Sequence, residues 1–231
     1  MEEHGILWVH LIPGLSALPE NVASSIVVLL ILLSLSLVYS IRSRNLEARV
    51  VPKGSPRLEE TIDALVGLVD GLAEEMMGER TRHYLPLLGS LFLYILLSNL
   101  VGLIPGFVPP TSNISTNFGM SLVVFVLYNV YGFKENGAGY LKHFMGPILL
   151  LSWLMFPIEV LSHLVRPVSL AVRLMGNMFG DHMVLSIFSG LIPVGIPVIF
   201  LALGTFVAVI QAFVFTLLST IYIALSTAHD H

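Results

Sequence analysis

The residues most able to do chemistry in this sequence lie in one apolar tract, between Ser152 and Asp181. At about 100° per residue in a helix, nine polar side chains of this tract fall within about a 120° sector. They are Ser152, Glu159, Ser162, His163, Arg166, Ser169, Arg173, Asn177 and Asp181. Scattered polar residues would not share a face, so the tract predicts a helix with a polar stripe. The stripe either packs on satisfied partners in a bundle or lines a path for ions.

Arg173 is the residue for which a purely structural role is hardest to sustain. It lies deep in the apolar tract, where a central arginine costs about 2.5 to 3.5 kcal/mol on membrane-insertion scales, and buried charges of this kind usually mark function. A guanidinium stays protonated at physiological pH, so it is a poor proton relay. It can instead act as a fixed positive charge that attracts an ionised carboxylate on a partner and repels protons passing directly.

Groups that can titrate or pass hydrogen bonds flank Arg173 on both sides. Four of them can titrate, and three more can hold waters or hand on hydrogen bonds. The titratable groups are Glu159, His163, Asp181 and His182, and the others are Ser162, Ser169 and Asn177. His182 falls off the stripe, so we expect it to face another helix. The last apolar tract adds one amide, Gln211, which is either functional or an interhelical hydrogen-bonding residue.

Composition places the chain in a membrane. Its 231 residues are 55% hydrophobic and 11% charged, with a mean hydropathy of +0.88, whereas soluble domains are about 25% charged. The net charge of -4 argues against nucleic-acid binding, which needs clustered basic residues. Cysteine is absent, which excludes disulfides and thiolate catalysis. We expect one membrane domain over residues 1–231, with no cofactor and no metal site.

Apolar runs of membrane-spanning length predict an all-α polytopic protein with five crossings. They cover residues 21–41, 84–104, 117–133, 144–190 and 192–228. The positive-inside rule places the N-terminus outside and the C-terminus in the cytoplasm. By this rule the two segments that contain the basic residues outside the spans are both cytoplasmic. The first contains Arg42, Arg44, Arg49, Lys53, Arg57, Arg80 and Arg82, and the second contains Lys134 and Lys142.

An amphipathic helix is expected at the membrane surface over residues 56–82. Apolar residues recur there at steps of three and four, opposite an acidic face. That face either docks against another subunit, which we favour, or is solvated. Further along the chain, Pro167 is expected to kink or bend the helix that carries the polar stripe.

Three segments resemble the signature of one family, subunit a of F-type ATP synthases. They are PVSLAVRLMGNMFG at 167–180, LLSNLVGLIPG at 96–106 and IQAFVFTLLSTIY at 210–222. Together with the span count, the resemblance covers nearly the whole chain after about residue 84. In this alignment Arg173 occupies the position of the family's essential arginine, Gln211 that of the facing glutamine and Asn177 that of a channel asparagine. Glu159, Ser162 and Ser169 match positions that line the cytoplasmic half-channel.

The resemblance implies a mechanism and partners. Protons enter one half-channel, protonate a carboxylate on a rotating ring of c subunits, and leave through a second half-channel near Arg173. The chain itself would be non-catalytic and would also contact peripheral-stalk b subunits and the other subunits of the complex. Its last two helices would lie strongly tilted against the ring. A bacterial inner membrane is the expected location. The choice between H⁺ and Na⁺ rests mainly with the ring subunit, and this sequence leaves it open.

One position departs from the family pattern, and two other function classes compete. Some family members carry a titratable group seven residues before the glutamine, where this chain has Gly204. His182, with Asp181, is then expected to serve the outer half-channel. A standalone ion-coupled secondary transporter would show repeated halves, and none is visible. An intramembrane protease would need a motif such as H-E-x-x-H, which the sequence lacks.

Overall fold

The computed structural model describes residues 18–43, 58–104, 106–137, 139–140, 152–191 and 195–227. Within these ranges all regular structure is helical, so the expectation of an all-α fold is confirmed. The elements are α1 (Glu20–Ser43), α2 (Leu58–Met77), η3 (Gly78–Arg80), α3 (Thr81–Gly102), η4 (Pro110–Ser112), α4 (Ile114–Asn136), α6 (Ser152–Leu191) and α7 (Ile196–Thr227). Parts of three expected helices, at residues 56–57, 144–151, 192–194 and 228, lie outside the described residues.

Five helices in the described ranges are long and apolar enough to cross a membrane. These are α1, α3, α4, α6 and α7, and their number confirms the predicted polytopic membrane fold. The exposed apolar side chains along them include Leu33 on α1, Val126 on α4 and Phe206 on α7. Such side chains are stable outside the protein core when lipid, rather than water, surrounds the helix.

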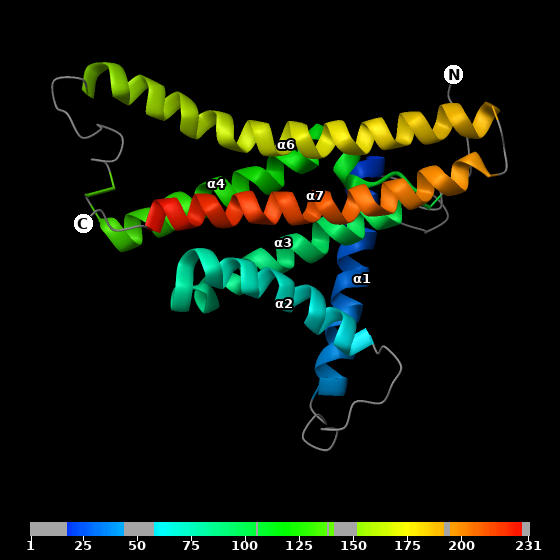
Figure 1. The fold of residues 1–231 in the computed structure, drawn as a ribbon, viewed down its shortest axis with the longest axis horizontal. Helices are drawn as coiled ribbons and strands as arrows, with labels where there is room; N and C mark the ends of the chain where they lie inside the picture. Colours follow the sequence, from blue (N-terminus) through cyan, green and yellow to red (C-terminus); the bar gives the residue numbers. More distant parts are fainter. Residues whose placement is uncertain are drawn as a thin grey trace. The chain divides into compact units, whose positions relative to one another are not determined.

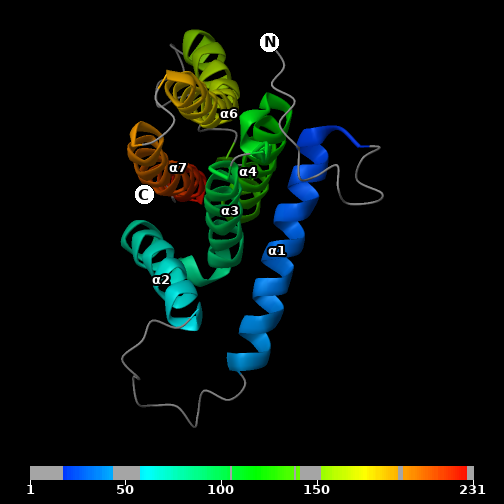
Figure 2. The same ribbon diagram turned by 90° about the vertical axis from the view of Figure 1, so that its right-hand side faces the viewer.

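The chain divides into two compact units, and the first contains the N-terminal helices together with Ala208–Thr216 of α7. Within it, α3 packs against both α1 and α2, as Figure 2 shows. The buried residues Leu88, Phe92 and Ile95 of α3 recur at helical spacing. The Tyr39 hydroxyl of α1 donates a hydrogen bond of 2.7 Å to Asp63 Oδ1 of α2. The predicted amphipathic helix is therefore linked to the first span by a polar contact.

The second unit contains α4, α6 and the two ends of α7, and it holds the polar stripe. Asn113 caps the start of α4, where its side chain accepts a hydrogen bond of 2.9 Å from the Ser115 backbone N–H. α4 packs along α6, whose buried residues Leu170, Ala171, Leu174 and Met178 form one seam at helical spacing. This seam fixes which side of α6 carries the stripe.

α6 is a continuous helix of 40 residues with Pro157 and Pro167 inside it. Figure 1 shows it bowed along its length without a break. Proline removes one backbone hydrogen bond and crowds the preceding turn, so a bend of the helix is its usual effect. The two halves of the polar stripe therefore stay on one helix.

Candidate functional site

Three charged or titratable side chains of the stripe meet near the start of α6. Glu159 and His163 are four residues apart, and Arg166 follows three residues later, so all three project from one side of the helix. The distance from His163 Nδ1 to Glu159 Oε1 is 3.8 Å, and that from an Arg166 terminal nitrogen to the same oxygen is 4.0 Å. The Glu159 side chain is 40% exposed and that of His163 only 13%. The carboxylate thus lies between a permanent cation and a group that can become one.

Aromatic rings from two other helices surround this cluster. The Arg166 guanidinium carbon lies 5.2 Å from the ring centroid of Tyr222 on α7, within the range of a cation–π interaction. On α4, the buried ring of Tyr128 lies between two partners, with centroid distances of 5.6 Å to His163 and 6.1 Å to Tyr222. These contacts hold Arg166 and His163 in fixed positions.

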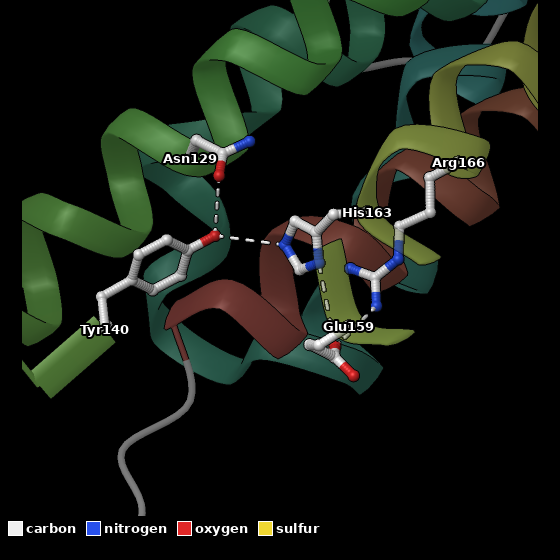
Figure 3. Close-up of polar contacts among 5 residues, drawn as sticks. All are labelled: Asn129, Tyr140, Glu159, His163 and Arg166. Atoms are coloured by element: carbon white, nitrogen blue, oxygen red, sulfur yellow. Dashed lines mark hydrogen bonds and ion pairs between the residues drawn. The ribbon is translucent and has the colours of Figure 1, made fainter. Parts of the chain in front are cut away.

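A tyrosine from beyond the end of α4 completes the cluster. α4 ends at Gly137, whose φ of 53° is a conformation that favours glycine. After this turn the buried ring of Tyr140 packs back against Gly132, where a Cβ would lie 2.5 Å from its Cε2 atom. As Figure 3 shows, its hydroxyl donates a hydrogen bond of 2.9 Å to Asn129 Oδ1 and lies 3.4 Å from His163 Nε2.

Arg173 lies two turns further along α6, in a different environment. Its side chain is exposed, and it forms no ion pair or hydrogen bond with any residue in the described part of the chain. Its neighbour Val172 is 50% exposed and Val168 is 47% exposed, so the surface next to the charge is apolar. Asn177, one turn on, is also exposed.

The remaining stripe residues are spread along α6. Ser162 is exposed, Ser169 is half-buried, and Asp181 and His182 are both half-buried. The Nε2 atom of His182 is buried and makes no hydrogen bond within the described residues. The side chain of Ser152 lies outside the described part. No group of three metal-ligating residues occurs among the residues that the structure describes.

Gln211 lies on α7, in the segment that belongs to the first compact unit. Its side chain is 3% exposed, as expected of an amide in an apolar membrane helix. Burial of this amide is compatible with both roles that the sequence leaves open. That it faces Arg173 stays a prediction from the resemblance.

No pattern in the sequence singles out Tyr140 or Asn129, and Tyr222 stands there only as the last residue of the motif at 210–222. Tyr140 follows a helix end, where no periodic pattern exists to place a side chain. Asn129 is one amide in the span of α4. The signals that could have indicated their pairing are Gly132 and Gly137, because glycine inside or after a helix often permits close approach or a turn.

The fold and the site define a class of protein: a multi-pass helical membrane protein in which one long helix carries titratable groups and an arginine without an ionic partner among the described residues. A family model described as ATP synthase A chain matches residues 22–224. The chain therefore belongs to the ATP synthase A chain family.

Individual relatives agree with this assignment. The chain is 44% identical to ATP synthase subunit a of Bdellovibrio bacteriovorus, over 97% of this chain and 98% of that protein. It is 46% identical to ATP synthase subunit a of a Geobacter species, over 87% and 86% of the two chains. It is 48% identical to ATP synthase subunit a 3 of Pelobacter propionicus, over 79% of each chain. These relatives do not favour the alternative of a standalone transporter.

Proposed function

We propose that this chain is the proton-translocating stator subunit of a rotary ATP synthase and that Arg173 separates two offset half-channels. The observation that carries the proposal is the exposed guanidinium of Arg173, which has no ionic or hydrogen-bonding partner in the described residues and lies on an apolar surface. A charge in lipid is costly unless a partner compensates it. The partner that fits is a carboxylate on a neighbouring subunit of the membrane.

The mechanism follows from the fixed charge of the arginine. When a protonated carboxyl group of a c-subunit ring approaches Arg173, the guanidinium stabilises its ionised form and so favours loss of its proton. The same positive charge opposes direct passage of protons between the two half-channels. Each proton moved across 100 mV supplies only about 2.3 kcal/mol, so a rotor must sum several transfers for each ATP made. The chain moves protons and carries no nucleotide chemistry of its own.

The two half-channels use different parts of α6. Glu159, Ser162, His163 and Ser169 line the cytoplasmic half-channel, while Asp181 and His182 serve the outer one. By the family resemblance, Asn177 is assigned to the channel, and Gln211 takes the position of the glutamine that faces the family's essential arginine. In this arrangement the N-terminus is outside and the C-terminus is cytoplasmic, and peripheral-stalk b subunits dock at the acidic face of α2.

Replacing Arg173 by alanine tests the proposal. In complete ATP synthase reconstituted into liposomes, Arg173→Ala abolishes ATP-driven proton pumping, because no fixed positive charge then favours deprotonation of the carboxyl group on the rotor. Assembly of the complex remains at the wild-type level. The matched control is Arg82→Ala, which removes an exposed arginine at the start of α3 and leaves pumping unchanged. Undiminished pumping by the Arg173→Ala complex would rule the proposal out.

A further inference from the structure

The hydroxyl of Tyr140 links two helices of the second unit at the polar cluster. It reaches Asn129 on α4 and His163 on α6, and the ring is buried against Gly132 (Figure 3). Neither Tyr140 nor Asn129 is among the residues that the proposed half-channels use. The Tyr140 hydroxyl contacts the His163 imidazole directly, whereas Asn129 is linked to it only through Tyr140.

The direction of each hydrogen bond can be worked out from a backbone group. The Asn129 side chain donates from Nδ2 to the carbonyl oxygen of Phe125, at 2.7 Å. A carbonyl oxygen can only accept, so the amide orientation is fixed and Oδ1 faces Tyr140. Because Oδ1 can also only accept, the single hydroxyl proton of Tyr140 points to Asn129.

This orientation leaves only the oxygen lone pairs of Tyr140 for His163. The contact of 3.4 Å with Nε2 is then a hydrogen bond only when Nε2 carries a proton and donates it. Neutral imidazole has one N–H, so the neutral form of His163 carries its proton on Nε2. Its other nitrogen, Nδ1, is the atom that gains or loses a proton, and this atom lies 3.8 Å from Glu159 Oε1.

We infer that Tyr140, oriented by Asn129, is a positioning residue that makes Nδ1 of His163 the atom exchanging a proton with Glu159. In the forward step the imidazolium gives its Nδ1 proton to the carboxylate, which leaves a neutral imidazole and a carboxylic acid. The reverse step restores the ion pair. The gap of 3.8 Å exceeds a hydrogen bond, so the exchange requires rotation of the half-exposed Glu159 side chain or a bridging water. The inference rests on the proposed function, since it extends the cytoplasmic half-channel.

The charged groups around His163 act on its imidazole in opposite directions. Glu159 favours the imidazolium, whereas the guanidinium of Arg166 on the same helix disfavours it. From the other helices, the Tyr128 ring of α4 faces His163 directly, and the Tyr222 ring of α7 lies under Arg166. Burial raises the pKa of the Tyr140 phenol, against the opposing effect of the Arg166 charge. The Tyr140 hydroxyl therefore keeps its proton and continues to donate to Asn129.

Tyr140→Phe in the complete ATP synthase tests the inference. Phenylalanine keeps the ring against Gly132 and removes only the acceptor for the Nε2 proton. Hydrogen bonds to charged groups are stronger than those to neutral ones, so we expect the imidazolium to be disfavoured about tenfold. The pH profile of ATP-driven proton pumping should then move to lower pH by about one unit. Asn129→Leu should move it in the same direction, because the freed hydroxyl then donates to Nε2 and no longer accepts from it.

A matched control and a double variant separate this role from simple packing. Tyr94→Phe, on α3, should leave the profile unchanged. In a His163→Gln background, Tyr140→Phe should produce no further shift, since its effect passes through the imidazole. A wild-type profile in both Tyr140→Phe and Asn129→Leu would overturn the inference, as would a shift that persists without His163. If His163→Gln is defective while those two variants are normal, only the role of Tyr140 is wrong. If Arg173→Ala and Glu159→Gln both pump normally, the proposed function itself is wrong.

Discussion

The arginine near the start of α6 and the arginine in its middle have opposite surroundings. Near the start, Arg166 has a carboxylate at 4.0 Å and an aromatic ring under its guanidinium. Two turns later, Arg173 is exposed and has no ionic partner in the described residues. Both arginines lie on the same polar stripe of one helix, so helical position alone does not explain the contrast.

What differs is which neighbours the fold supplies. At Arg166, α4 and the C-terminal part of α7 bring Tyr128 and Tyr222 against the helix. Around Arg173, α6 buries only its apolar seam and leaves the charged side without a partner from the described chain. A charge that is paired within the chain holds the neighbouring side chains in place. A charge without such a partner in an apolar setting indicates a partner on another subunit. The comparison predicts that substitutions around Arg166 slow proton pumping and that loss of Arg173 abolishes it.

Glu159→Gln should have the largest effect within the paired region. Glutamine keeps the size of the side chain but cannot accept and release a proton at neutral pH. We expect ATP-driven pumping to slow about tenfold, in proportion to a tenfold slower ATP hydrolysis, so that coupling is retained. The measurement is the ratio of protons pumped to ATP hydrolysed in liposomes. A normal pumping rate would show that Glu159 is not on the cytoplasmic path.

Arg166→Gln should have a smaller effect and tests the comparison directly. The substitution removes a partner of Glu159 and the cation above Tyr222, but it leaves the exchangeable groups in place. Partly exposed ion pairs and cation–π contacts each contribute about 1 kcal/mol or less, so we expect pumping to fall by about threefold to fivefold. Complete loss of pumping, as expected for Arg173→Ala, would mean that the two arginines are not functionally distinct. Arg166→Lys should restore most of the rate.

His182→Ala should have the smallest effect on the maximal rate and a clear one on its pH dependence. This side chain is half-buried on α6, away from both arginines along the sequence, and its imidazole can accept and release a proton. Since Gly204 supplies no titratable group, loss of His182 should alter the pH profile on the outer side of the membrane and leave that on the cytoplasmic side unchanged. An unaltered outer profile would assign the outer path to Asp181 and other groups.

The sequence predicts the parts of this molecule that depend on local pattern. Apolar runs identify five spans, and the helical repeat places Glu159, His163 and Arg166 on one face of α6. Contacts between helices cannot be predicted in this way, because they depend on tertiary packing and not on the periodicity of one helix. Tyr140 reaches His163 only because α4 ends in a turn at Gly137 and Gly132 leaves room for a ring.

The same limit applies to Arg173 and Gln211. The apolar tract around Arg173 predicts a functional charge, whereas its exposure on α6 could follow only from knowing which face α4 covers. Gln211 is a single amide at no informative spacing, and its burial is a tertiary property. Its role therefore continues to rest on the family pattern.

The length of α6 has a consequence for how protons must travel. Its apolar stretch, Trp153–Phe188, comprises 36 residues, which is about 54 Å of helix for a hydrocarbon layer of about 30 Å. If it were straight and lay wholly within that layer, the helix would incline by about 55° from the membrane normal. Glu159 and Asp181, about 33 Å apart along the axis, are then displaced sideways by about 27 Å. On the proposed assignment of these two residues to separate half-channels, entry and exit do not share one line along the membrane normal, and the group that carries the proton between them moves laterally through the membrane.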